Sequence, residues 1–373
     1  VGEAAGVSAT LGAEALDGAN GFRIDGSVGG SLGASVAGGA DVNGDEIDDL
    51  ILGAPSANSD AGAAYVLFGK TTPFAAVVDP SVSLGVNGVR LDGRALDRAG
   101  ASVAIGGDVN GDGIGDILVG APGSDPNNVY LVYGQSEPFA SSIDLSALDG
   151  QNGIVYFDTS AGSLGTSVDF VGDLNGDGFD DFVVGEITAS GASSANFIFG
   201  QESLPAVVPR SFLDGDRGFL FLITENPSFD ANITVAGAGD VNSDGFDDVV
   251  IGSDIASGGE SLLIFGNASF ESAVQPSELN GSNGVRFVGD GLSDPVSAAS
   301  GLGDINGDGI ADLAVNTFGK SHLASTHIVL GREEEWPAQL DVSKLHGRDG
   351  FRVDANLPVA DIDFTTFTVE NYP

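Results

Sequence analysis

The 373-residue sequence predicts an all-β protein, a β-propeller built from four-stranded blades. Three observations support this prediction: a repeat of 64 to 67 residues, short apolar segments bounded by glycine-rich turns, and the near absence of capped segments with helical periodicity. A small sheet that recurs around a ring avoids long open edges. A parallel β-helix is the alternative, although its coils would need a much shorter period.

An acidic nonapeptide marks the repeat. Its first copy, 41–49, reads DVNGDEIDD, and further copies begin at Asp108, Asp173, Asp240 and Asp304. A second marker of the type NGVR or DGFR keeps the same period along the chain. Because two independent markers share one period, we interpret the chain as a series of equivalent units.

Each unit contains four candidate strands in a fixed order. In the first unit, an Ala-, Ser- and Val-containing stretch at 33–40 precedes the acidic loop, and a β-branched run at 50–53 follows it. The next strand, 63–69, ends in an aromatic–Gly pair, and the last, 86–90, carries the second marker. Short strands separated by Gly-rich turns are typical of all-β architectures.

The repeat divides the chain into a central array and two terminal segments. Residues 1–26 resemble the last strands of a further unit, and residues 354–373 fall where the first strand of that unit belongs. Joining the two ends would close a sixth blade, although its second strand and its acidic loop are missing. The five complete units occupy 27–353, at about 27–92, 93–157, 158–222, 223–288 and 289–353.

The acidic loops have the donor pattern of a calcium site. Each reads D-x-N-x-D-x-x-x-D, so side-chain oxygens alternate at positions one, three and five, position seven offers its backbone carbonyl, and position nine closes the shell. An all-oxygen donor set suits Ca²⁺, whereas Mg²⁺ keeps more water. Turn formation alone would explain one such loop; five loops with the same donors predict about five Ca²⁺ ions. The predicted ligands are Asp41, Asn43, Asp45, Ile47 and Asp49; Asp108, Asn110, Asp112, Ile114 and Asp116; Asp173, Asn175, Asp177, Phe179 and Asp181; Asp240, Asn242, Asp244, Phe246 and Asp248; and Asp304, Asn306, Asp308, Ile310 and Asp312.

Position six of the loop is expected to form a sharp turn. Four loops have Gly there, which permits the turn at little steric cost. The first loop has Glu46 instead, so we expect that loop to be strained or to bind its ion more weakly.

The charge of the chain restricts its partners. Lys and Arg number 13 against 54 Asp and Glu, which gives a net charge of -41. Nucleic-acid binding is excluded, because phosphate contacts need clustered Lys and Arg. No run approaches the roughly 18 apolar residues of a membrane span, so we expect no membrane insertion. The chain begins at Val1 without a leader pattern, and we expect it to be part of a larger protein.

Two further motifs complete a family resemblance. Gly53-Ala54-Pro55 follows the second candidate strand of the first unit, and Phe68-Gly69 ends the third. Over about residues 16 to 353, the units resemble FG-GAP repeats, which form the N-terminal β-propeller of integrin α subunits and occur in many bacterial surface proteins. The chain departs from that pattern at Gly185-Glu186-Ile187, at 252–254 and at 315–317, and it cannot supply the seven repeats of an integrin.

The resemblance implies a division of roles between two faces. The metal loops would join the first and second strands of each blade and have a structural role, while partners would bind the opposite face. By position, the loops of that face are Ser56–Gly62, Gly93–Ala99, Ser124–Asn128 and Lys320–Ser325. Arg94 and Arg98 lie there, and we expect them to form salt bridges with Asp92 or Asp97 more than to contact a ligand.

We therefore expect the chain to be a calcium-stabilised extracellular or cell-surface β-propeller that acts in cell adhesion or ligand recognition. It would bind a protein or glycan ligand and would not catalyse a reaction. The alternatives are a carbohydrate-binding or purely structural module of a larger secreted protein, or an accessory domain of a hydrolase or lyase. Only His322, His327 and His346 are present, no nucleophile-elbow motif is evident, and His327 is expected to be a packed residue of an apolar strand.

Overall fold

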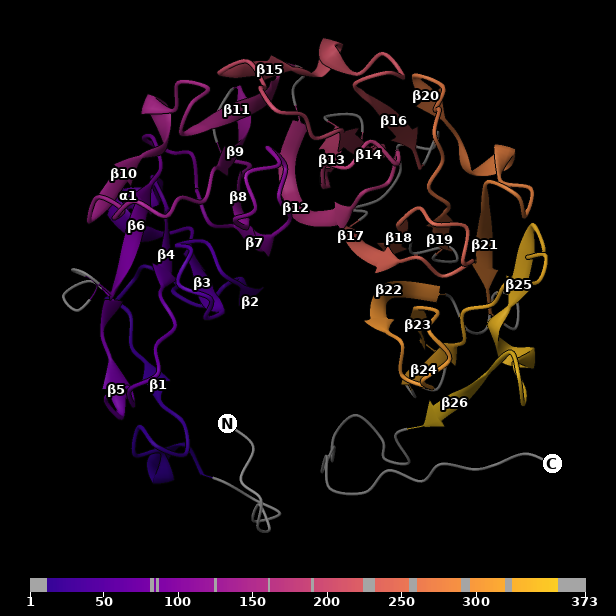
Figure 1. Ribbon diagram of the computed structural model, residues 1–373, viewed down its shortest axis with the longest axis horizontal. Helices are drawn as coiled ribbons and strands as arrows, with labels where there is room; N and C mark the ends of the chain where they lie inside the picture. Colours follow the sequence, from indigo (N-terminus) through magenta and orange to yellow (C-terminus); the bar gives the residue numbers. More distant parts are fainter. Residues whose placement is uncertain are drawn as a thin grey trace.

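In the computed structural model, five β-sheets follow one another along the chain and are arranged in an arc around a common centre (Figure 1). The structure describes residues 12–80, 84, 87–123, 126–159, 162–188, 191–223, 232–254, 260–289, 296–318 and 324–354. Within these residues, no helix has the length and apolar character needed to cross a bilayer. The chain is all-β, as the sequence predicts.

Each sheet begins with an innermost strand and continues outward through three antiparallel neighbours (Figure 1). The first sheet contains β2 (Val36–Ala40), β3 (Asp49–Ala54), β4 (Ala63–Leu67), β6 (Gly88–Asp92) and β10 (Ser142–Asp144). The second contains β7 (Ser102–Gly106), β8 (Asp116–Ala121), β9 (Asn127–Val132), β11 (Gly153–Asp158) and β15 (Val207–Pro209). The third contains β12 (Gly162–Gly172), β13 (Asp181–Thr188), β14 (Ser193–Ile198), β16 (Gly218–Leu222) and β20 (Ala273–Val274). The fourth contains β17 (Asn232–Gly239), β18 (Asp248–Asp254), β19 (Glu260–Ile264), β21 (Gly284–Val288) and β25 (Gln339–Asp341). The fifth contains β22 (Val296–Gly303), β23 (Asp312–Phe318), β24 (Ala324–Val329) and β26 (Gly350–Asp354).

The remaining elements are short. The 3-10 helices are η1 (Ala13–Ala15), η3 (Leu145–Ala147), η4 (Arg210–Phe212), η5 (Pro276–Glu278) and η7 (Val342–Lys344). The turn labelled α1 (Ala57–Asp60) is not a regular right-handed helix, because Asn58 and Ser59 have φ of 53° and 59°. A separate pair joins β1 (Arg23–Ile24) to β5 (Val77–Val78).

The prediction of four strands per blade is incomplete. In the first four sheets a short fifth strand lies parallel to the fourth, and it comes from the segment that precedes the fourth strand of the next unit. These segments have only two or three paired residues, too few to show strand alternation in the sequence. Each therefore fastens one sheet to the outer edge of its predecessor.

The N-terminal segment repeats this arrangement in part. β1 pairs in parallel with β5, just as the fourth strand of the first sheet pairs with β10. Residues 12–26 thus contain a strand that pairs as a fourth strand does, and its membership of a further unit stays a prediction. The predicted C-terminal strand at Asp361–Val369 lies outside the described residues.

The hydrophobic cores lie between neighbouring sheets. One cluster packs Ile51 and Val66 of the first sheet against Val103 and Ile117 of the second. Burying a side chain of this size contributes about 1.5–3 kcal/mol relative to leaving it exposed. Strands such as β3 and β8 are therefore apolar on both faces, since each sheet is covered on two sides.

Candidate metal-binding loops and the opposite face

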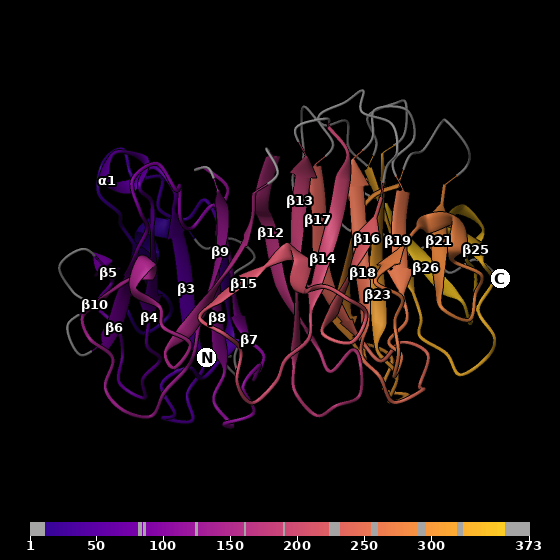
Figure 2. The ribbon, with the colours of Figure 1, turned by 90° about the horizontal axis from the view of Figure 1, so that it is seen from above.

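The five acidic loops join the first and second strands of the five sheets, as the resemblance implied. α1 follows the second strand of the first sheet and therefore lies at the other end of that sheet, at the upper edge in Figure 2. The strands thus separate a face of acidic loops from a face that carries α1.

Side chains at positions one, three and five order each loop. In the third loop, Asp173 Oδ1 accepts the N–H of Gly176 (2.7 Å) and of Asp177 (3.0 Å). Asn175 Oδ1 accepts the same Asp177 N–H, its amide donates to Asp177 Oδ2, and Asp177 Oδ1 accepts the N–H of Phe179. Equivalent bonds among positions one, three, five and seven recur in the other four loops. The side chains at positions one and three therefore both accept the backbone N–H of position five.

The Asp at position nine has a different environment. Asp181 is fully buried at the start of β13, where Oδ2 accepts the N–H of Leu174 (3.0 Å) and Oδ1 accepts that of Gly200 (2.8 Å). The equivalent Asp is buried and bonded in this way in every loop. Through these two hydrogen bonds, the carboxylate links the start of the loop to the aromatic–Gly pair that follows the third strand.

The aromatic–Gly pair requires glycine at its second position, because backbone and side-chain atoms of the acidic loop lie close to that residue. A Cβ on Gly200 would stand 2.4 Å from the carbonyl oxygen of Asp180 and 2.8 Å from Cβ of Phe179. Any side chain there would push the backbone N–H away from Asp181. The sequence marked this pair as a repeat signature but did not reveal that it serves the acidic loop.

Burial affects the pKa of four of the position-nine carboxyls. Desolvation raises the pKa of Asp116, Asp181 and Asp248 to about 8, and that of Asp49 to about 6. The backbone N–H bonds oppose this rise, and the loop's other carboxylates add to it. A nearby cation would favour the ionised form of these groups.

Position six forms the predicted sharp turn in a left-handed backbone conformation. Its glycines have φ between 86° and 92°. Glu46 also lies in this region, with φ of 65°, so the expected strain of the first loop is confirmed. Its weaker metal binding stays a prediction.

Neighbouring loops are joined in series. The N–H at position eight donates to the carbonyl at position one of the preceding loop, as from Asp180 to Asp108 (3.1 Å) and from Asp247 to Asp173 (3.2 Å). In these two pairs a second hydrogen bond runs in the opposite direction. Asp180 Oδ2 accepts the N–H of Asp108, and Asp247 Oδ2 accepts the N–H of Asp173. Each loop is thus supported by the sheet that follows it.

The donor set of these loops fits calcium in its chemistry, since every candidate ligand is a hard oxygen. Among the described residues, however, no three acidic or His side chains are grouped closely enough to hold one ion. The loop oxygens instead accept hydrogen bonds from backbone N–H groups. Calcium binding therefore stays a prediction.

Two loops on the opposite face are held together by backbone hydrogen bonds. Arg98 N donates to Asp60 O (3.0 Å) and Ala99 N to Ala61 O (3.1 Å), which joins Gly93–Ala99 to Ser56–Gly62. Arg94 forms the expected ion pair with Asp97, at 3.2 Å. The other two predicted loops lie partly outside the described residues, at 124–125 and 320–323.

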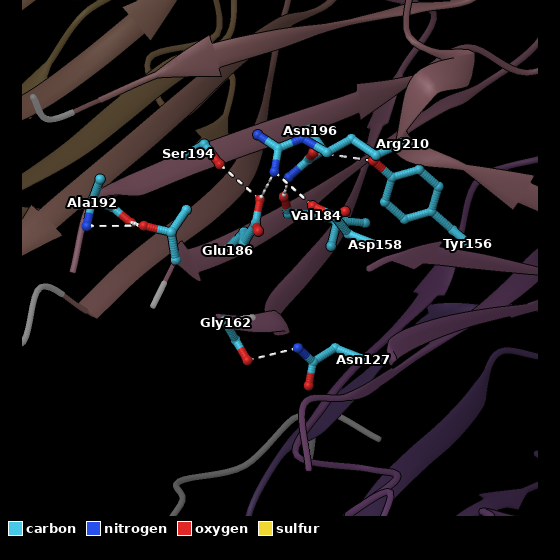
Figure 3. Close-up of polar contacts among 12 residues, drawn as sticks. Asn127, Tyr156, Asp158, Gly162, Val184, Glu186, Ala192, Ser194, Asn196 and Arg210 are labelled. Carbon is cyan, nitrogen blue, oxygen red and sulfur yellow. Dashed lines mark hydrogen bonds and ion pairs between the residues drawn. The ribbon is translucent and has the colours of Figure 1, made fainter. Parts of the chain in front are cut away.

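A buried polar cluster occupies one of the positions that depart from the repeat pattern (Figure 3). Arg210 Nη1 donates to Asp158 Oδ2 (2.7 Å) and to Glu186 Oε2 (2.8 Å), and Ser194 Oγ donates to the same Glu186 oxygen. Glu186 replaces the Ala of Gly-Ala-Pro and is almost fully buried. The cluster links β11 in the second sheet to β13 in the third. The altered Gly-Ala-Pro motif indicated in the sequence that Glu186 is unusual. It gave no indication that Arg210 is the partner of Glu186.

The histidine prediction is confirmed for one residue. His327 is buried on β24, with Nε2 3.1 Å from Thr317 Oγ1. His346 Nδ1 lies 2.8 Å from Lys344 O, and His322 is outside the described residues.

Comparison with known families extends these observations. A sequence model of the FG-GAP repeat matches residues 32–67 and 99–133, which span the first three strands of the first and second sheets. The chain contains FG-GAP repeats. This family implies a β-propeller, in agreement with the radial arrangement of the sheets.

Proteins with sequences similar to this chain include integrin alpha subunits. Integrin alpha-X of Homo sapiens is 36% identical over 94 residues, which are 25% of this chain and 8% of that protein. Integrin alpha pat-2 of Caenorhabditis elegans is 27% identical over 248 residues (61% and 18%), and integrin alpha-5 of Xenopus laevis is 28% identical over 253 residues (63% and 21%). The match thus spans a small part of each relative's length.

Among solved structures, AofleA from Arthrobotrys oligospora aligns at 10% identity with a TM-score of 0.35, over 82% of this chain and 71% of that chain. A likeness of this size adds nothing to the assignment of fold or function.

Proposed function

We propose that the chain is a calcium-stabilised extracellular β-propeller that recognises a protein or glycan ligand, as in cell adhesion, and does not catalyse a reaction. The observation that carries the proposal is the recurrence of one oxygen-donor loop, with one hydrogen-bond pattern, on the same face of five consecutive sheets. The FG-GAP repeats and the integrin alpha relatives support an adhesive or ligand-binding role.

The calcium shell is proposed to use five groups in each loop. In the third loop these are the side-chain oxygens of Asp173, Asn175 and Asp177, the backbone carbonyl of Phe179 and the carboxylate of Asp181. Five bound ions would change the net charge from -41 to about -31 and reduce the repulsion among loop carboxylates. The role of the metal is therefore structural.

The ligand is proposed to bind the face opposite the acidic loops. Gly93–Ala99 and Ser56–Gly62 support this assignment, because they are held in one arrangement by backbone hydrogen bonds while Leu96 and Arg98 remain exposed. A preorganised loop pair loses little conformational entropy when it binds a partner.

The five sheets are proposed to be propeller blades, with the unit boundaries given by the repeat, and residues 1–26 and 354–373 are proposed to contribute to a sixth blade. A surface location, outside the cell, agrees with the integrin relatives.

Three measurements test the proposal. Native mass spectrometry of the chelator-treated chain after calcium addition is expected to show about five bound ions, and a chain that binds none would contradict the structural metal. Glycan and protein arrays probed with and without Ca²⁺ are expected to show binding that substitutions of Leu96 and Arg98 abolish. Binding that ignores these residues would contradict the assigned face, and turnover abolished by a carboxylate or His substitution outside the metal loops would contradict a non-catalytic role.

A further inference from the structure

The two loops on the face opposite the acidic loops have an unfavourable backbone. In Gly93–Ala99, Leu96 and Arg98 have φ of 66° and 56°. The neighbouring loop Ser56–Gly62 adds three consecutive residues of this kind, so the two loops hold five of the eight non-glycine residues with positive φ in the described part of the chain. A Cβ makes this left-handed backbone unfavourable. Other contacts must therefore hold the loops in their form.

A buried carboxylate lies between the two left-handed residues of Gly93–Ala99. The Asp97 side chain is fully buried. Its Oδ2 accepts the hydroxyl of Tyr130 (2.5 Å), the backbone N–H of Arg94 (3.1 Å) and Arg94 Nε (3.2 Å), and its Oδ1 accepts Arg94 Nη2 (3.3 Å). Burial of a charge is costly unless the charge is paired and hydrogen-bonded. These donors thus stabilise Asp97 inside the protein and fix the loop around it.

One of these donors comes from a neighbouring sheet. Tyr130 lies on β9, the third strand of the second sheet, and is 1% exposed. Asp97 lies in the loop that leaves β6, the fourth strand of the first sheet. Gly123, which follows β8 of the second sheet, also donates its N–H to Asp97 O (2.9 Å). The second sheet therefore holds Asp97 by its side chain and by its main chain.

The propeller repeat does not require a hydroxyl at this place. Tyr130 stands three residues before the aromatic residue of the aromatic–Gly pair, and the last three sheets have Asn196, Leu262 and His327 there. All three are buried, so a sheet packs against its neighbour without a tyrosine at this position. The contact of Tyr130 with Asp97 is thus a property of this loop and not of the repeat.

Asp97 is the buried anchor between two exposed side chains. Leu96 and Arg98, on either side of it, are exposed on the face opposite the acidic loops. Arg98 N donates to Asp60 O, so the same short segment also holds the neighbouring loop. An anchor at this point fixes the directions in which both exposed side chains project, and this lowers the entropy lost on binding a partner.

We infer that Asp97 and Tyr130 are positioning residues of the proposed ligand face. Their buried contact keeps Gly93–Ala99 in its strained form and so fixes the placement of Leu96 and Arg98. Neither Asp97 nor Tyr130 would touch the ligand. The inference rests on the proposed ligand face and adds that the second sheet sets the shape of the loop. Without the contact, the two left-handed residues are free to relax, and the exposed side chains lose their fixed placement.

Hydrogen exchange of the loop tests the inference directly. Tyr130→Phe removes only the hydroxyl. The N–H groups of Arg98 and Ala99, which are bonded to Asp60 O and Ala61 O, are expected to lose protection by at least about tenfold, because the loop opens more often. Unchanged protection of both N–H groups would overturn the inference.

Tyr156→Phe is the matched control. The Tyr156 hydroxyl is equally buried and donates to Asn196 Oδ1 of the third sheet (3.0 Å), away from Gly93–Ala99. This variant is expected to leave the protection of Arg98 and Ala99 unchanged, with urea unfolding recording the loss of overall stability in both variants. An equal loss of loop protection in the two variants would show a global effect and overturn the inference.

A second pair of variants tests the carboxylate from its other side. Arg94→Gln removes the guanidinium that pairs with Asp97 and is expected to lower the protection of Arg98 and Ala99. Arg90→Gln removes an arginine of the same exposure (40% against 41%), whose partner Asp92 lies on β6, and is expected to change that protection little. A larger effect of Arg90→Gln would overturn the inference. Asp97→Asn should have the strongest effect, and if it does not fold, the other variants still decide.

Binding supplies a readout that a purely structural role would not change. A protein or glycan that the arrays identify as binding through Leu96 and Arg98 is expected to bind Tyr130→Phe about tenfold more weakly, because the loop is less preorganised. Unchanged affinity together with faster exchange would overturn the positioning role. Exchange needs no ligand, so arrays without a binder contradict the proposed function alone, and unchanged exchange contradicts this inference alone.

Discussion

Replacement of the position-nine carboxylate separates its structural role from its proposed metal role. Asp181→Ala removes the acceptor of two buried N–H groups, those of Leu174 and Gly200. An unsatisfied buried donor costs about 1–3 kcal/mol, so we expect a loss of about 2–6 kcal/mol in the free energy of unfolding. Because the hydrogen bonds form without metal, the loss is expected in chelator as well as in calcium.

Asp177→Ala is the matched control within the same loop. Asp177 is exposed, and its side chain accepts bonds from Phe179 N and the Asn175 amide. Without metal, we expect this substitution to cost about 1 kcal/mol, since exposed hydrogen bonds contribute little. With calcium, it should cost more and remove one ion from the metal count.

The assay is urea unfolding of the parent, the two single variants and the double variant, each with calcium and with chelator. In the double variant, we expect no chelator effect at that blade. An Asp181→Ala curve that matches the parent in chelator would refute the hydrogen-bond argument. Variants that keep their full metal count and chelator response would refute the metal site.

Three further predictions concern other parts of the fold. Glu46→Gly should stabilise the chain by about 1 kcal/mol in thermal unfolding, because glycine adopts this left-handed backbone conformation without the steric strain of a Cβ. Destabilisation would show that Glu46 makes a compensating contact. Arg210→Ala should lower the free energy of unfolding by about 3–5 kcal/mol, because it leaves buried Glu186 without its counter-charge. In a double-mutant cycle, the added change Glu186→Ala should recover part of that loss. Strictly additive losses would contradict the coupling. Burial raises the pKa of Asp169 to about 6, so the folded state holds this proton more tightly, and Asp169 should lower the free energy of unfolding by up to about 3 kcal/mol as pH rises from about 4 to about 6. The buried position-nine carboxyls add to the fall in this pH range, so Asp169→Asn should make the pH profile shallower by that amount without flattening it; an unchanged profile would contradict the prediction.

The sequence predicted the repeating parts of this protein because they depend on local chemistry. The acidic loops follow from alternating Asp and Asn, the left-handed turn from Gly at position six, and the strand order from apolar runs between turns. The strain at Glu46 could be read in advance for the same reason, since a turn of fixed φ penalises any side chain.

Contacts between units were not predictable in this way. The two- and three-residue parallel strands carry too few residues to form a pattern, and they become strands only beside the outer edge of the preceding sheet. The partnership of Arg210 with Glu186 and Asp158 joins residues up to 52 positions apart, which no local rule selects. The linkage of position nine to the aromatic–Gly pair likewise needs two strands to be placed side by side.

The sequence by itself thus determined the unit: its period, its four main strands and the oxygen donors of its loop, because each arises within a short stretch of chain. Only the tertiary structure decided how units meet. Whether Ile305 or Val241 is covered depends on the presence of a following sheet and not on the residue, since both are apolar and occupy the same position of the same loop.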